Sequence, residues 1–285
     1  MNFETKQEIL DWYENQPRAL TDNFIRGLPW ETVKDHPFDH RFVPVLRYMR
    51  DVETLTDMYY REMMRTPTGR DPVISKFMER WGVEEVTHGE VLNRFLNELG
   101  YESDAAWQSH VRNSVSNAYN AKTYLVTLLT NLVGSKFTAT HMTFGAIHEM
   151  TTVQSYRRLM ELSGHPVLRT LLRGIIREES AHTQFYWSVA RLELRNNDFA
   201  KKVARYVIEH FYYPVGQGSK PKHEVEYTIA MLFSEGTGMA NLETTIKQRM
   251  QQLPGFDNVT TVTDTIGRIC RENAPNLLMT CKEAV

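Results

Sequence analysis

The sequence predicts an all-α protein whose core is a bundle of four long helices. Most of its 285 residues follow the 3.6-residue apolar rhythm of amphipathic helices, and almost no segment alternates as a strand does. The longest rhythmic segments are separated by turn-rich stretches such as TPTGRDP and SGHP, whose Pro and Gly residues do not fit a helix interior. We therefore expect a single helical domain over residues 1–285.

The helices can be placed in order along the chain. An N-terminal arm, residues 1–39, begins with a short amphipathic helix over residues 4–14 and continues as an irregular stretch between Pro17 and Pro37. The core bundle then covers residues 40–195. Its long helices are expected at residues 40–65, 71–100, 136–162 and 166–195, with one or two shorter helices between the second and the third.

The C-terminal region, residues 196–285, is expected to add flanking helices to the bundle. Pro214 and the segment GQGSKPK mark a loop, and two or three shorter helices follow it. GQGSKPK lacks the Gly-Lys-Ser/Thr order of a phosphate-binding loop, so we interpret it as an exposed turn.

Composition excludes several classes of function. The formal net charge of −2 gives no electrostatic reason to expect nucleic-acid or membrane-surface binding. No segment approaches the ~18 apolar residues of a membrane span, and the N-terminus does not resemble a signal peptide, so we expect a cytoplasmic protein. Cys270 and Cys281 are the only cysteines, which excludes a four-cysteine metal site and favours reduced, unpaired thiols.

One pattern occurs twice: EEVTH at residues 84–88 and EESAH at residues 178–182. On a helix, residues three apart share a face, so Glu85 lies beside His88 and Glu179 beside His182. Each pair can hold one metal ion. The chain contains two Glu-Glu dipeptides, and both have a His three residues after the second Glu, which makes an incidental origin improbable.

Ferritin-like four-helix bundles hold two metal ions with one Glu from each of two helices and a Glu-x-x-His from each of the other two. The additional carboxylates are expected from Glu53 and Glu149, each on the helix that precedes a Glu-x-x-His. Asp57 and Glu62 are alternatives to Glu53 on the same helix, and a buried ion pair is the alternative for Glu149. Such donors suit two iron ions, or one iron and one manganese, bridged by carboxylates and open to O2.

At this point the residues resemble the soluble acyl-carrier-protein desaturases. WGVEEVTHGEVLNRFL at 81–96 is similar to the Trp-x-x-Glu-Glu-x-x-His-Gly-Asp block of that family, and ETL at 53–55 to its first-helix Glu. HEMTT at 148–152 resembles Gln-Glu-Arg-Ala-Thr, and IIREESAH stands where the family has Asp-Glu-x-x-His. The resemblance covers about residues 40–215. It departs from the family at Thr87 and Ala181, where Arg is common, and at Glu178, where Asp is usual.

The resemblance implies an O2-dependent di-iron oxidase that acts on an unactivated C–H of a fatty acyl chain, foremost an acyl-[acyl-carrier-protein] desaturase. It implies a ferredoxin-like electron donor, an acyl carrier protein or acyl thioester as partner, and a homodimer. It places Thr152 on the oxygen side of the cluster as a catalytic residue, and Trp30 is the candidate for the family's surface Trp. Two further sets of residues are expected to serve the substrate. An apolar tunnel is expected from Leu92, Met142, Phe144, Gly145 and Ala146, and a basic docking surface from Arg157, Arg158, Arg169, Arg173, Lys201 and Lys202.

Other functions remain open at this point. A hydroxylase or an N-oxygenase on a carrier-bound substrate would use the same ligands, although the related N-oxygenases have an additional His where this chain has Ile175. An iron-storage ferritin-like protein would need the bundle alone. A radical-generating reductase subunit would favour Asp in the place of Glu53. His141 lies outside the predicted ligand set, and His148 points about 100° away from Glu149, toward the second shell or the core.

Overall fold

The computed structural model describes residues 1–280, which form twelve α-helices, three short 3₁₀ helices and no β-strand. The prediction of an all-α protein is confirmed. The α-helices are α1 (Lys6–Glu14), α2 (Asp22–Arg26), α3 (Val43–Met64), α4 (Pro72–Glu98), α5 (Trp107–Asn113), α6 (Asn117–Val133), α7 (Thr138–Ser163), α8 (Pro166–Leu194), α9 (Asp198–Phe211), α10 (Lys222–Phe233), α11 (Gly238–Gln251) and α12 (Thr261–Thr280).

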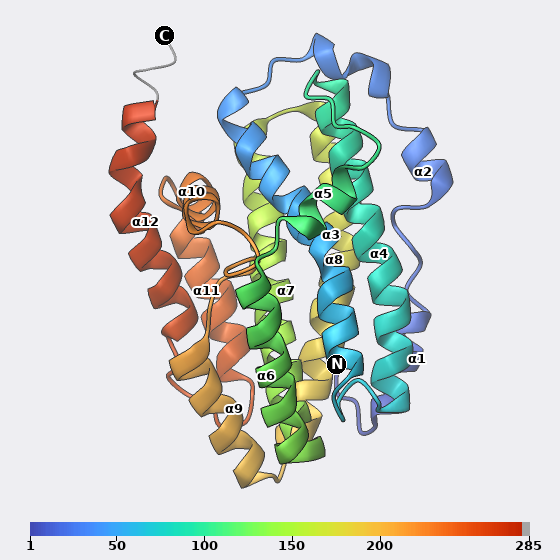
Figure 1. The fold of residues 1–285 in the computed structure, drawn as a ribbon, viewed down its shortest axis with the longest axis vertical. Coiled ribbons are helices and arrows are strands. Elements are labelled where there is room, and N and C mark those ends of the chain that lie inside the picture. Colours follow the sequence, from blue (N-terminus) through green and yellow to red (C-terminus); the bar gives the residue numbers. More distant parts are fainter. Residues whose placement is uncertain (281–285) are drawn as a thin grey trace.

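The four long helices α3, α4, α7 and α8 form the bundle as two hairpins, α3 with α4 and α7 with α8 (Figure 1). The termini of these helices follow from local sequence. The Asp71 carboxylate caps α4 by accepting from the backbone N–H groups of Val73 and Ile74. The α7 helix ends at Gly164, whose φ of 62° is the left-handed conformation that glycine adopts without strain. The predicted boundaries of these helices agree within a few residues.

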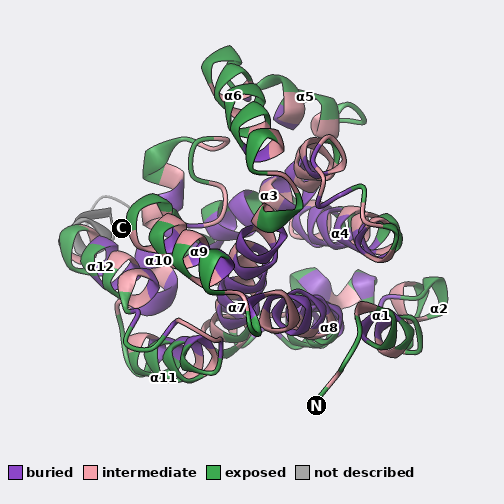
Figure 2. Cartoon of the chain, turned by 90° about the horizontal axis from the view of Figure 1, so that it is seen from below, coloured by how far each residue is buried: buried purple, intermediate pink, exposed green. Residues whose placement is uncertain are grey.

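The remaining helices surround this bundle. The arm helix α1 packs against α4 and α8, whereas α9, α10 and α11 pack against α7 and α12 packs against α10 and α11 (Figures 1 and 2). The α9 helix lies between the end of α8, which agrees with the predicted end near residue 195, and the loop at Pro214, in the region where flanking helices were expected. None of the described helices is long and apolar enough to cross a membrane.

One expectation about a single residue was wrong. Trp30 is buried with 4% of its surface exposed, and its indole N–H donates to the carbonyl of Ile25, so it is no surface tryptophan. The GQGSKPK segment forms a turn as predicted, exposed at residues 217, 218, 221 and 222, and the nearly buried Lys220 ammonium, 2.7 Å from the Asp51 carboxylate, anchors it to α3. Cys270 is a buried free thiol, and Cys281 lies outside the described residues.

Candidate metal centre

The six predicted ligands meet in the middle of the bundle. They form two overlapping groups in which the potential ligand atoms lie within 4.8 Å of one another. One group contains Glu53 and His88, the other contains Glu149 and His182, and both share Glu85 and Glu179. This is the arrangement of two metal positions with one carboxylate and one imidazole each, joined by two carboxylates that can bridge. The alternatives for Glu53, Asp57 and Glu62, are not part of either group.

The two Glu-x-x-His pairs also approach each other across the bundle. His88 Nδ1 on α4 lies 3.1 Å from Glu179 Oε1 on α8, and His182 Nδ1 on α8 lies 3.1 Å from Glu85 Oε1 on α4. All six side chains are 0–8% exposed. The two hairpins therefore contribute matching halves to one enclosed cluster.

The cluster fits a pair of cations because its inward atoms have no other partner. Both histidine Nδ1 atoms, Glu85 Oε1 and both oxygens of Glu179 are buried, and apart from their approaches to one another inside the cluster they have no hydrogen-bond partner. Burial and the charge of Glu179 together raise the pKa of Glu85 and of Glu149 well above the usual range for glutamate. Unpaired, crowded carboxylates are costly in a protein interior, and divalent metal ions would satisfy them.

The first glutamate of each Glu-Glu pair holds the histidine of the other helix. Glu84 Oε2 on α4 lies 2.7 Å from Nε2 of His182 on α8, and Glu178 Oε2 on α8 lies 3.0 Å from Nε2 of His88 on α4. Each imidazole then donates its Nε2–H outward and turns Nδ1 toward the cluster. We call Glu84 and Glu178 the outer carboxylates. This crossed pairing explains why the chain has Glu-Glu-x-x-His twice rather than Glu-x-x-His alone.

The N-terminal arm completes these contacts. The Arg18 Nε atom lies 3.2 Å from Glu84 Oε1 and 3.3 Å from Glu178 Oε1, so one guanidinium pairs with both outer carboxylates, and Arg80 Nε, 2.9 Å from Glu84 Oε1, adds a second cation. The Tyr13 hydroxyl donates to Glu84, and the backbone N–H groups of Ala19 and Leu20 donate to Glu178. The imidazole side of the cluster is thus closed by the arm, which supplies the cation that Thr87 and Ala181 do not.

These contacts keep the outer carboxylates charged. Burial opposes the ionisation of Glu84, but its hydrogen bond and charge interaction with His182, followed by the bonds from Tyr13 and Arg80, lower its pKa to about 2. Burial likewise opposes the ionisation of Glu178, and the bond to His88 outweighs it and lowers that pKa. Both groups are therefore anionic acceptors at neutral pH.

Replacing Arg18 by alanine is expected to weaken metal binding about tenfold, because two adjacent buried carboxylates lose the cation they share. A chelator competition titration with Fe²⁺ or Co²⁺ measures the change in affinity. Arg26→Ala is the matched control on the same arm, since the Arg26 side chain is 74% exposed and pairs with the exposed Asp22. Equal affinities for Arg18→Ala and wild type would contradict the role of the arm.

Aromatic donors hold the two terminal carboxylates. The Tyr156 hydroxyl on α7 donates to Glu53 on α3, and the Trp81 indole N–H on α4 donates to Glu149 on α7 at 3.0 Å. Both donors come from a different helix than the carboxylate they hold. Glu53 and Glu149 are thereby each held by the other hairpin, and both line a cavity that neither His88 nor His182 lines, so they mark the carboxylate side of the cluster.

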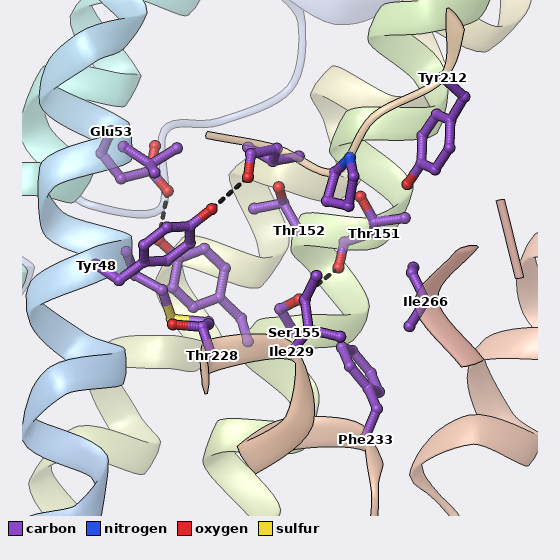
Figure 3. A pocket seen from close by; sticks show the side chains of 15 residues that line it. Tyr48, Glu53, Thr151, Thr152, Ser155, Tyr212, Thr228, Ile229, Phe233 and Ile266 are labelled. Carbon is purple, nitrogen blue, oxygen red and sulfur yellow. Dashed lines mark hydrogen bonds between the residues drawn. The ribbon is translucent and has the colours of Figure 1, made fainter. Parts of the chain in front are cut away.

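Two apolar cavities open on this carboxylate side. The larger, about 150 Å³, is reached by Glu53, Glu85, Glu149 and Glu179 and is walled by α3, α4, α6, α7, α8 and the loop after Tyr212. The smaller, about 60 Å³, continues between α3, α7 and α10, where Ile229 and Phe233 close it (Figure 3). Both cavities are lined by Val52, Glu53, Thr152 and Val215, so they adjoin beside the cluster.

Thr152 lies where these two cavities meet, one turn along α7 from Glu149. His148 borders the larger cavity, where its ring nitrogen Nε2 lies 3.1 Å from the Tyr213 carbonyl oxygen. His141 is remote from the cluster and bonds Thr68.

The predicted tunnel was only partly right. Phe144 and Gly145 line the larger cavity, but Leu92, Met142 and Ala146 are fully buried in the core and line neither cavity. Gly145 was expected to leave room for a substrate tunnel, but its missing side chain serves another purpose. A Cβ atom there would stand 2.5 Å from the ring of Tyr186, so the glycine admits a neighbouring aromatic side chain.

Arg158 is not available to the basic docking surface that the sequence predicts. The guanidinium of Arg158 donates to the carbonyls of Leu232 and Glu235 and pairs with Glu161, so it fastens α7 to the loop after α10. Of the others, Lys201 pairs with the exposed Asp198.

Comparison with known proteins places the cluster within a family. Residues 46–189, about half of the chain, match the Rubrerythrin family model. The matched segment runs from α3 into α8 and contains all six residues of the cluster. No curated protein matches the chain. The match supports the ferritin-like bundle that the sequence predicts and does not extend to the desaturases.

Proposed function

This chain belongs to the rubrerythrin family of ferritin-like di-iron carboxylate proteins, and we propose that it is an O2-dependent di-iron oxidoreductase. The substrate that we propose is a fatty acyl chain, and the reaction is the removal of hydrogen from an unactivated C–H, as in an acyl-[acyl-carrier-protein] desaturase. The observation that carries this proposal is the pair of apolar cavities that reach the carboxylate side of the cluster. An iron-storage protein requires no such cavity.

In this proposal Glu53 and His88 would hold one iron ion and Glu149 and His182 the other, while Glu85 and Glu179 belong to both groups of ligands. Bound iron would supply the electrons and the open coordination positions with which O2 is activated. The protein determines the side from which a substrate can reach the metal cluster. The arm closes the imidazole side, whereas apolar walls on the carboxylate side exclude water and orient a flexible chain beside Glu53 and Glu149.

The remaining parts of the proposal concern Thr152 and the partners. The Thr152 hydroxyl borders both cavities, one turn from Glu149, so it can pass a proton between the cavity and the cluster. Arg157, Arg169, Arg173, Lys201 and Lys202 remain the candidates for docking an acidic acyl carrier protein. A ferredoxin-like protein is the proposed electron donor.

A cavity-filling variant tests the proposal. Val52 lines both cavities, so Val52→Phe should reduce oxidation of a long-chain acyl-carrier substrate by at least about tenfold and leave the metal content unchanged. Product from reduced protein and O2 is measured by mass spectrometry. Val83→Phe is the control, because Val83 is 57% exposed on α4. A wild type that stores iron but oxidises no acyl chain would overturn the proposal.

A further inference from the structure

A polar pocket of about 280 Å³ lies between α7 and α11, at the end of α10. It is lined by the first two turns of α11, by Phe233, and by four residues of α7, namely Gln154, Arg157, Arg158 and Glu161. We call it the arginine pocket. Phe233 is the only large apolar residue among those that line it, so the pocket suits a polar ligand rather than an apolar one.

Two side chains in this pocket have no partner within residues 1–280. The exposed Arg157 guanidinium forms no ion pair and no hydrogen bond there. The Gln154 side chain is only 7% exposed, yet its amide makes no hydrogen bond with another described residue. A buried amide without a partner is costly and calls for an explanation. A ligand that accepts hydrogen bonds in the arginine pocket would satisfy both side chains.

The charge of the arginine pocket favours an anion. Its one carboxylate, Glu161, lies 3.0 Å from Arg158 Nη1, so these two charges offset each other and Arg157 leaves the pocket positive. The α11 helix begins at Gly238, which lines the pocket, and the Thr237 side chain makes no capping hydrogen bond there. The positive end of a helix dipole and its free backbone N–H groups attract an anion.

The arginine pocket meets the smaller apolar cavity at Phe233, which is the one residue that lines both. Figure 3 shows Phe233 at the end of the smaller cavity that lies away from Glu53. Thr151 lines the smaller cavity, and Gln154, three residues later on α7, lines the arginine pocket. A polar, positively charged site at the surface is therefore followed by apolar cavities that reach the cluster.

We propose that the arginine pocket holds the oxyanion head of a long-chain amphiphile, a carboxylate or a phosphate ester, whose chain passes Phe233 into the two apolar cavities. Arg157 and the Gln154 amide donate to the head. Arg157 follows Glu149 by eight residues on α7, a rise of about 12 Å that a long acyl chain can span. The inference rests on the proposed function and deepens it, because the acyl chain enters with its own charged head and needs no carrier protein at this opening.

Ligand binding to the purified full chain, measured by calorimetry without reductant or O2, tests the head-group site. Dodecanoate and dodecyl phosphate should bind about tenfold more tightly than dodecanol, because only they pair with Arg157. Arg157→Gln should remove most of this preference and leave dodecanol binding unchanged, and Gln154→Leu should reduce it several-fold. Lys222→Gln is the control, since Lys222 begins α10 at its other end, has 84% of its side chain exposed and pairs with Glu226.

The length of the chain tests the passage beside Phe233. In wild type the affinity should rise ~fourfold with each methylene between octanoate and dodecanoate, because each added methylene enters an apolar cavity. Val52 lines both cavities, so Val52→Phe should stop this rise at a shorter chain and leave the preference for an anion intact. The relative affinities of dodecanoate and dodecyl phosphate identify the natural head group.

Three results would overturn the inference. They are equal affinities for dodecanol and both anions, anion binding that Arg157→Gln leaves unchanged, and an affinity that does not depend on chain length. The proposed function can fail separately. A chain that binds as expected but is not oxidised by reduced protein and O2 would overturn the proposed function alone. Oxidation of an acyl-carrier substrate by a protein that binds neither free anion would overturn this inference alone.

Discussion

Replacing Glu179 by alanine is expected to abolish binding of both metal ions. Glu179 belongs to both ligand groups, its two oxygens have no hydrogen-bond partner, and they lie 3.1 Å from His88 Nδ1 and 3.6 Å from His182 Nδ1. The loss of a bridging ligand removes one donor from each position at once. Metal content should fall from about two ions per chain to near zero, and oxidase activity with it.

Glu161→Ala provides the control for this variant. Glu161 lies on α7 with 50% of its side chain exposed and pairs with Arg158, so the variant should retain both metal ions. Circular dichroism separates loss of metal from loss of fold. A folded Glu179→Ala protein that still binds two ions would show that Glu179 does not bridge.

Each outer carboxylate is expected to strengthen metal binding at the histidine of the opposite helix. Glu84→Ala should weaken the metal position of His182 by ~10–100-fold and affect the position of His88 much less, since Glu84 bonds His182 Nε2 at 2.7 Å. Glu178→Ala should do the reverse, because Glu178 bonds His88. In terms of free energy, such losses correspond to about 1.4–2.8 kcal/mol of metal binding.

Titration with Co²⁺, followed by its visible absorption, distinguishes the two positions. Each single variant should show one tight and one weakened binding step, and the double variant should show two weakened steps. Glu84→Gln and Glu178→Gln keep an acceptor for the imidazole and should recover part of the affinity. If each variant instead weakened Co²⁺ binding at the position of the histidine on its own helix, the crossed arrangement would be wrong.

Much of the cluster could be predicted from local sequence. Glu85, His88, Glu179 and His182 follow from helical spacing alone, and Glu149 follows from the need for further carboxylates on neighbouring helices. The structure brings all of them together with Glu53. Such ligands can be recognised in a sequence because metal coordination requires them at fixed separations along a helix.

The surroundings of the cluster could not be predicted in the same way. Arg18 and Tyr13 reach the outer carboxylates from an arm more than sixty residues away in sequence, which no helical spacing indicates. The repeated Glu-Glu dipeptide was the one available signal for Glu84 and Glu178. Tyr156 and Trp81 resemble ordinary core aromatics until their hydrogen bonds to Glu53 and Glu149 are seen.

The residues expected to line the tunnel show a further limit of prediction from sequence. Apolar residues on a long helix occupy both the core and the cavity wall, and only the rotation of the helix against its neighbours decides between them. Phe144 lines the larger cavity, whereas Met142 is in the core. The same rotation leaves the leucines of α6 outward, although their periodicity alone predicts a buried face.

The dinuclear centre is tested most directly by elemental analysis of the purified wild-type chain, expressed in iron-replete medium. The account predicts about two iron ions per chain, or one iron and one manganese, and the loss of metal in Glu149→Ala and His182→Ala. A well-folded wild type with a single zinc ion or with no metal would contradict it.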